Sequence, residues 1–320
     1  MSSEPQLAAP SPGAADRDDA VVRAARAQLT DVEATAVAVS KFRVAAAKLR
    51  RPDGSPFFDA SFDAALCNAV LPQDEQAALL AQFQDHMIAV LAVRTAEIDE
   101  HVMAAVGAAP GSSSDTGSSS GSSPGVRQLV ILGAGLDMRA WRLPLEGAGS
   151  SSGSSSGGVT VFELDSGTTE SLKTRVLGPA PPPGRCRRAF VQADLEDPEQ
   201  ALDRLRAAGW DPAAPSVFVL EGLIGYLSVA AGDALLARLR SAAAPGSRLL
   251  LTTPPSPAWR DELQASRGVK LHHTTFEEPE QTLGRAVAAG WSGAELRGAE
   301  ALAAKYGMPQ NRQGVILAAV

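Results

Sequence analysis

The stretch VILGAGLDMRAW, residues 130–141, places Gly133 and Gly135 directly after an apolar run that predicts a β-strand. Glycines in such a position let the backbone turn sharply and approach a ligand closely. In open α/β sheets, ligands bind beyond the carboxyl ends of the strands, where the strand order reverses. The stretch therefore predicts a ligand site after the first strand of an α/β sheet. A tight turn without a ligand is the alternative for this motif taken alone.

The segments after this stretch alternate between strand-like and helix-like patterns, as is typical of a parallel sheet with helical crossovers. Helices are predicted over 169–177, 198–208, 229–243, 276–289 and 300–306. Strands are predicted over 128–132, 159–164, 189–192, 217–220, 248–252, 293–297 and 314–320. The expected fold is a doubly wound α/β domain with a seven-stranded sheet.

Composition divides the rest of the chain into a helical lobe and three segments without apolar periodicity. Residues 1–20 are rich in Pro, Ala, Ser and Asp and are expected to form a disordered arm. Apolar residues recur at helical spacing in 31–51 and 74–109, which predicts a helical lobe over 21–110. The Ser/Gly tracts at 111–126 and 147–158 have the composition of flexible insertions. Because predicted strands flank both tracts, 127–320 is expected to be one domain.

Acidic residues follow the next three predicted strands: Asp165, Asp194 and Glu221. A carboxylate after the second strand can accept hydrogen bonds from both ribose hydroxyls of an adenosine cofactor, and Asp165 is preferred to Glu163 for this role. A helix cap is the alternative for Asp165 and Asp194. So many carboxylates would repel a diphosphate, and Met138 stands where the dinucleotide fingerprint has Gly or Ala. The pattern favours the cationic nucleoside S-adenosylmethionine over NAD.

The overall composition argues against several other classes of protein. The formal net charge is −7, and the concentrated basic patch that nucleic-acid binding needs is missing. Two cysteines, and four histidines without metal-ligand spacing, predict neither a disulfide framework nor a metal site. No apolar run is as long as a membrane span, and the N-terminus lacks the pattern of a signal peptide. We therefore expect a cytoplasmic protein without nucleic-acid or membrane partners.

Four segments of the chain resemble the leucine carboxyl methyltransferase family, and most closely its bacterial-type S-adenosylmethionine-dependent branch. They are VILGAGLDMRAWRL (130–143), VFELD (161–165), ADL (193–195) and LEGLIGYL (220–227), within a similarity that runs from about residue 34 to the C-terminus. The resemblance implies a class I methyltransferase fold, which is Rossmann-like, with an antiparallel last strand and an N-terminal helical cover. It also implies S-adenosylmethionine as the cofactor.

The resemblance further implies a role for individual residues. Arg94, in the helix before the first strand, would bind the carboxylate of the cofactor, and Gly133 its methionine segment. The remaining implied contacts are Asp165 with the ribose, Asp194 and Leu195 with the adenine, and Glu221 with the methionine amino side. Residues 57–62 lack the Pro-Tyr pair that follows the acid in the family. The lobe that would cover the acceptor therefore departs from the family, and the acceptor is not determined.

The predicted reaction is O-methylation, in which an oxygen nucleophile takes the methyl group from the sulfonium. The expected acceptor is a carboxylate, on a small molecule or a protein C-terminus, or a hydroxyl. A carboxylate needs no general base, whereas a hydroxyl does. Tyr226 and the pair His272 and His273 are candidates for that base, with a structural role as the alternative for each. The alternative functions are an NAD(P)-dependent oxidoreductase and a non-catalytic methyltransferase-like scaffold.

Overall fold

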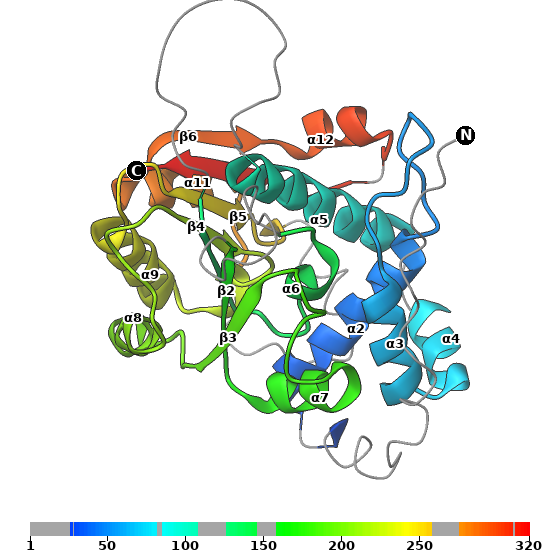
Figure 1. Ribbon diagram of the computed structural model, residues 1–320. Helices are drawn as coiled ribbons and strands as arrows, with labels where there is room; N and C mark the ends of the chain where they lie inside the picture. Colours follow the sequence, from blue (N-terminus) through cyan, green and yellow to red (C-terminus); the bar gives the residue numbers. More distant parts are fainter. Residues whose placement is uncertain are drawn as a thin grey trace, which may run out of the picture.

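The computed structural model of the chain describes seven ranges of residues. They are 26–27, 29–81, 85–107, 126–145, 158–257, 275–309 and 311–320. The predicted arm over 1–20, nearly all of both Ser/Gly tracts, and His272 with His273 lie outside these ranges. The ribbon in Figure 1 shows the arrangement of the described elements.

A seven-stranded sheet forms the centre of the fold, in the order β3-β2-β1-β4-β5-β7-β6. Its strands are β1 (Gln128–Leu132), β2 (Thr160–Asp165), β3 (Arg187–Gln192), β4 (Ser216–Leu220), β5 (Arg248–Thr252), β6 (Ser292–Arg297) and β7 (Val315–Ala319). Strands β1 to β5 pair in parallel, whereas β7 runs antiparallel to both β5 and β6. The predicted doubly wound sheet with an antiparallel last strand is confirmed, and each strand lies within two residues of its predicted limits at either end.

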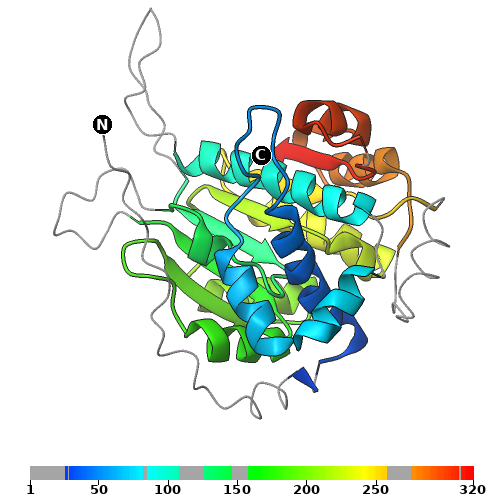
Figure 2. The same ribbon diagram turned by 90° about the vertical axis from the view of Figure 1, so that its right-hand side faces the viewer.

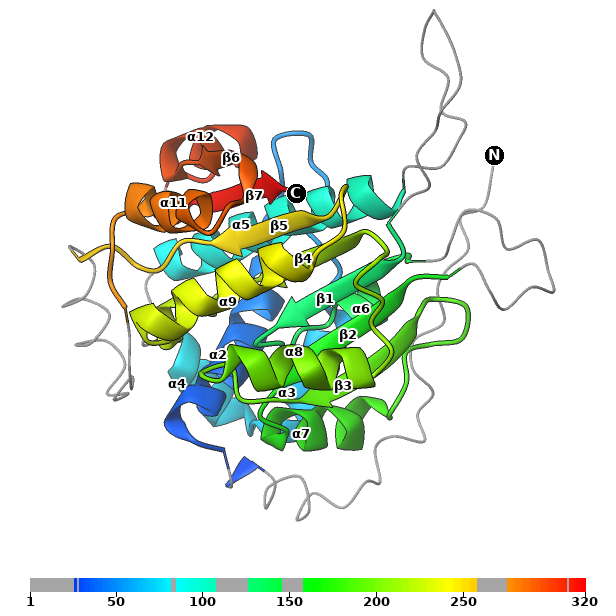
Figure 3. The same cartoon turned by 90° about the vertical axis from the view of Figure 1, so that its left-hand side faces the viewer.

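Helices cover both faces of this sheet because its strands alternate apolar side chains between two cores. Leu129 and Ile131 face a core that includes α5 (Asp85–Val106) and α12 (Ala299–Tyr306). Val130 and Leu132 face the opposite core, with α8 (Pro198–Ala207), α9 (Val229–Ala242) and α11 (Pro279–Ala288). Figure 3 shows α8 and α9 in front of the sheet, and Figure 2 shows the opposite side. Because β1 to β5 are parallel, their carboxyl ends meet at one edge of the sheet.

The N-terminal helices lie beside this edge. They are α2 (Asp31–Ala46), α3 (Ser61–Val70) and α4 (Gln73–Ala81). A capping box begins α2: the Thr30 hydroxyl accepts from the Glu33 backbone N–H at 3.2 Å, and the Glu33 carboxylate accepts from the Thr30 N–H at 2.8 Å. The sequence reading missed α3, although Phe62, Leu66 and Val70 recur in it at a spacing of four residues.

Three helix predictions differ from the structure. The helix predicted over 31–51 ends at Ala46, and the one predicted from 276 begins at Pro279, after the cap residue Glu278. The predicted stretch 74–109 contains α4 and α5, and residues 82–84 between them lie outside the described ranges. The glycine stretch leads into α6 (Arg139–Arg142), which has only four residues and ends at Leu143, in extended conformation before Pro144. The helix N-terminus expected beside the ligand is therefore a single turn. Within the described ranges, no helix combines the length and apolar character needed to cross a membrane.

Candidate active site

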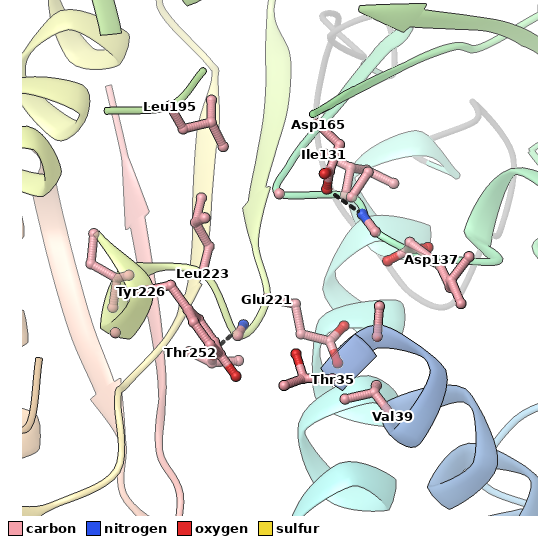
Figure 4. Close-up of a pocket in the computed structure, with 18 of the residues that line it drawn as sticks. Thr35, Val39, Ile131, Asp137, Asp165, Leu195, Glu221, Leu223, Tyr226 and Thr252 are labelled. Carbon is pink, nitrogen blue, oxygen red and sulfur yellow. Dashed lines mark hydrogen bonds between the residues drawn. The ribbon is translucent and has the colours of Figure 1, made fainter. Parts of the chain in front are cut away.

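A cavity of about 660 Å³ lies at the carboxyl ends of β1, β2, β4 and β5, where α2 and α5 close it. Figure 4 shows side chains from the strand ends and from α2 around one space. The structure brings every predicted site residue of the described ranges to the lining of this cavity: Arg94, Gly133, Gly135, Asp165, Asp194, Leu195, Glu221 and Tyr226.

The glycine turn after β1 is tied to the end of β2. Gly133 and Gly135 have φ angles of 64° and 47°, a left-handed conformation that glycine adopts without steric cost. The Gly135 backbone N–H donates to Asp165 Oδ2 at 2.6 Å, as the dashed line in Figure 4 shows. A Cβ atom on Gly133 would lie 2.7 Å from Leu223 Cδ1. The absence of side chains at Gly133 and Gly135 thus leaves room for a ligand along the backbone of the turn.

The acids at the ends of β2 and β3 are not helix caps. Gly167 occupies the N-cap of α7 (Thr168–Leu177), and Asp197 caps α8 by accepting from the Gln200 N–H at 3.1 Å. The cap alternative for Asp165 and Asp194 was therefore wrong. Asp194 is exposed at the cavity rim, and the neighbouring Leu195 is buried.

Glu163, unlike Asp165, is not among the residues that line the cavity. Its side chain is fully buried, and its Oε2 accepts from Lys173 Nζ and from Arg188, each at 2.6 Å. These two cations also lie over the ring of Trp141, at 5.2 and 4.5 Å from its centroid. Glu163 therefore joins the sheet to its helical cover, which supports the choice of Asp165 for the site.

Glu221, at the end of β4, is the centre of a buried ionic cluster. Its Oε1 accepts from Arg94 Nε at 3.0 Å, from Arg43 at 3.3 Å and from the Thr95 hydroxyl at 2.9 Å. Its Oε2 accepts from Arg139 at 2.6 Å. Burial alone would raise the pKa of Glu221, but the three guanidinium groups hold it well below its usual range. Glu221 is therefore ionised at neutral pH.

A further layer of ion pairs supports this cluster. Arg139 is fully buried and donates to Asp99 Oδ1 at 2.8 Å and to Asp137 Oδ2 at 2.5 Å. Asp99 also pairs with Arg142. We call the set the arginine–carboxylate cluster: Arg43, Arg94, Asp99, Asp137, Arg139, Arg142 and Glu221. Only Arg94 and Glu221 were predicted as site residues. The other members could have been suspected from charged residues that stand among apolar ones in the sequence, as in the segment LDMRAWRL (136–143).

Arg43 and Arg94 present two cations to one part of the cavity. Burial lowers the pKa of Arg94, and attraction to Glu221 offsets this only in part. Burial also lowers that of Arg43, but its pKa is raised overall by Glu221 and Asp63. Both guanidinium groups share the Oε1 atom of Glu221. This end of the cavity is therefore suited to an additional anionic group.

Asp63, on α3, lies behind Arg43 and makes a testable contribution to stability. It is fully buried, 3.8 Å from the Arg43 guanidinium, and burial raises its pKa from 3.8 to about 6. The folded chain therefore holds this proton more tightly than the unfolded chain. The free energy of unfolding therefore falls as the pH rises through the folded-state pKa of about 6, and it levels off above that pH. Between pH 5 and pH 8 the fall amounts to about 1.5 kcal/mol.

Urea unfolding at both pH values checks this expectation. The stability of Asp63→Asn relative to the wild type should increase by that amount from pH 5 to pH 8. Asp203→Asn, at an exposed carboxylate on α8, controls for the substitution itself. A difference between Asp63→Asn and the wild type that is the same at both pH values would contradict the raised pKa.

The fold and the site together define a class I methyltransferase, because the cavity opens at the carboxyl ends of β1, β2 and β4 and the last strand is antiparallel. The model of the leucine carboxyl methyltransferase family matches residues 34–240. The chain belongs to the leucine carboxyl methyltransferase family. It is an S-adenosylmethionine-dependent methyltransferase.

Individual relatives agree with this assignment. A protein from Mycobacteroides abscessus, named as a candidate S-adenosyl-L-methionine-dependent methyltransferase, is 36% identical over 262 residues, which are 80% of this chain and 75% of that protein. A second, from Mycolicibacterium paratuberculosis with the same description, is 37% identical over 181 residues, 57% of this chain and 48% of its own length.

Two crystal structures share the fold. One is a candidate methyltransferase from Thermobifida fusca, with a TM-score of 0.52 and 18% identity over 81% of this chain and 92% of that one. The other is a DUF574 family protein from Streptomyces avermitilis, with a TM-score of 0.51 and 15% identity over 81% of this chain and 95% of that one.

Within the described ranges, no group of three or more His, Cys, Asp or Glu side chains is arranged to hold a metal ion.

Proposed function

We propose that the cavity holds S-adenosylmethionine across the strand ends and that the chain methylates an oxygen of a carboxylate or hydroxyl acceptor. The observation that carries the proposal is the difference between the two ends of the cavity. Carboxylates, Asp165 and Asp194, line the end at β2 and β3, whereas the guanidinium groups of Arg43 and Arg94 line the other. A nucleoside with hydroxyl and amino donors suits the first end, and an amino-acid carboxylate suits the second.

Each lining residue then has a defined task. Asp165 accepts from the ribose hydroxyls, Asp194 accepts from the adenine amino group, and Leu195 packs against the ring. Arg94, with Arg43 beside it, binds the carboxylate of the methionine segment. Gly133 and Gly135 let that segment approach the backbone.

Glu221 has two tasks in this proposal. Its Oε1 holds Arg43 and Arg94 in place, and its Oε2, which accepts from Arg139, would also accept from the amino group. When bound, S-adenosylmethionine supplies a methyl group on a positively charged sulfur. The side chains of α2 and α5 exclude water from that region and align the acceptor oxygen.

Tyr226 is the residue we propose to contact the reacting oxygen. It lies in η2 (Ile224–Tyr226), just after β4, is half-buried, and lines the cavity. Figure 4 shows its ring beside Leu223 and Thr252, turned toward the cavity. With a carboxylate acceptor, its hydroxyl would only orient the nucleophile, because no proton has to be removed. The carboxylate acceptor and a cytoplasmic location stay predictions.

Calorimetry with S-adenosylmethionine, S-adenosylhomocysteine and NAD tests the cofactor site directly. Asp165→Ala is expected to weaken binding of S-adenosylhomocysteine about tenfold to hundredfold, because both ribose hydrogen bonds and the bond to Gly135 are lost. Asp203→Ala is the matched control, since this carboxylate lies on the exposed face of α8 and should leave binding unchanged. Binding of NAD in preference to both sulfur nucleosides would overturn the proposal.

Two structural features disfavour the alternative functions. A diphosphate would need a helix N-terminus at the glycine turn, but α6 is a single turn and Met138 at its start is 1% exposed. An oxidoreductase is therefore a poorer match to the site. A non-catalytic scaffold would be expected to have lost cofactor positions, whereas all seven that were predicted line the cavity.

A further inference from the structure

Part of the cavity lies away from the residues proposed to hold the cofactor. It is bordered by α2, α5, the residues that follow β5, and η2. We call this lining the acceptor wall: Thr35, Val39, Phe42, Met87, Val90, Leu91, Tyr226, Pro254 and Pro255. In Figure 4, Thr35 and Val39 lie below Glu221, across the open space from Tyr226.

Two helices each turn one apolar face to this space. On α2, Thr35, Val39 and Phe42 recur at the spacing of one helix face, and on α5 so do Met87 and Leu91. This explains why the wall is continuous along both helices. Arg43 lies one turn beyond Val39, and Arg94 one turn beyond Leu91, along the same helices. Each helix thus presents an apolar stripe that ends in a guanidinium group at the floor of the cavity.

The apolar side chains of the wall are buried even though they line the cavity. Phe42, Met87, Val90 and Leu91 are 1–7% exposed. Apolar side chains that line an open cavity are characteristic of a site for an apolar ligand.

The charged and polar groups of the region point to the same kind of ligand. The described residues of the wall include no carboxylate, histidine, lysine or arginine. Gln313, beside it, already uses its amide: Oε1 accepts from Arg94 at 3.3 Å and the NH₂ group donates to the Thr253 carbonyl. A peptide would bury backbone N–H and C=O groups here with few partners, which is costly.

We propose that the acceptor wall selects a small molecule with an apolar aromatic or aliphatic body and a single oxygen nucleophile. This inference rests on the proposed function, since the acceptor must reach the bound cofactor. The new bond joins the acceptor oxygen to the methyl carbon while the carbon–sulfur bond breaks. Its electron pair stays on sulfur, which becomes a neutral thioether. A carboxylate acceptor has no proton to release, and a hydroxyl releases one to solvent.

Binding of a homologous series to the chain loaded with S-adenosylhomocysteine tests the proposal without relying on turnover. The probes are butyrate, hexanoate, octanoate and 2-naphthoate, with 2-naphthol for the hydroxyl class. Lactate and a tripeptide ending in leucine represent hydrophilic and peptide acceptors. Affinity is expected to rise about fourfold for each added methylene until the wall is covered. Lactate and the tripeptide should bind at least tenfold more weakly than octanoate.

Val39→Phe places a larger side chain in the acceptor wall and so narrows the cavity beside it. Val44→Phe is the control. Both residues are half-buried on α2, but Val44 is not part of the cavity lining. Val39→Phe should weaken binding of 2-naphthoate at least tenfold and leave S-adenosylhomocysteine binding within threefold of the wild type. Val44→Phe should change neither.

Three results can be distinguished. Failure of the wild type to bind S-adenosylhomocysteine would remove the proposed function. Intact cofactor binding with no increase along the series, or with preference for lactate or the tripeptide, would overturn the apolar acceptor alone. Equal binding of 2-naphthoate by Val39→Phe and the wild type would also overturn the apolar acceptor, without affecting the proposed cofactor site.

Discussion

Replacement of Arg139 by methionine is expected to lower the free energy of unfolding by about 3 to 5 kcal/mol, because it removes one partner of a buried ionic network. Arg139 is fully buried and bonds to Asp99, Asp137 and Glu221. Methionine retains most of the apolar stem but leaves these carboxylates with one cation fewer in a dry environment. Equilibrium unfolding in urea measures the effect.

The control for this variant is Arg206→Met. Arg206 pairs with Asp203 on α8, with the two side chains 45% and 70% exposed. Such a surface pair contributes less than about 1 kcal/mol. An equally small loss for Arg139→Met would mean that the arginine–carboxylate cluster contributes no more to folding than a pair in solvent.

Gly133→Val is expected to reduce binding of S-adenosylhomocysteine at least a hundredfold, about 2.7 kcal/mol. A β-branched residue tolerates a positive φ angle poorly, and the φ of Gly133 is 64°. The new Cβ would also lie 2.7 Å from Leu223 Cδ1, in the wall of the cavity. Either the turn or Leu223 must then shift into the space proposed for the methionine segment. Calorimetry measures the change in affinity.

Gly293→Val separates backbone strain from blockage of the cavity. Gly293, in β6, has a φ of 55°, and a Cβ built on it meets nothing within 4 Å. Its variant should lose stability but keep its affinity for S-adenosylhomocysteine. Comparable loss of affinity in both variants would show that strain, and not the occupied space, is responsible for the effect at Gly133.

The strands and the rim of the site were predictable because they depend on local patterns. Runs such as LVIL in β1 and LLLT in β5 are buried on both faces, so continuous apolar residues mark them. Parallel strands bring their carboxyl ends to one edge, and therefore Asp165, Asp194 and Glu221 could be placed together from their positions after consecutive strands.

The arginine–carboxylate cluster was not predictable in the same way. Arg43 and Arg94 are separated from Glu221 by more than a hundred residues, and a charged residue on a helix is usually exposed. Only the packing of α2 and α5 over the strand ends buries these guanidinium groups beside the carboxylate. The role implied for Arg94 came from family resemblance, whereas Arg43, Asp99 and Arg139 received no role at all.

The sequence alone determined the succession of the seven strands along the chain, the glycine turn and the acids at the strand ends, because hydrophobic periodicity and backbone freedom act over a few residues. Tertiary structure alone decided which charges are buried, that Glu163 faces away from the cavity, and that α2 and α5 share an apolar wall. These features depend on contacts between distant segments. Burial then sets their electrostatics, raising the pKa of Asp63 and giving Glu221 three arginine partners.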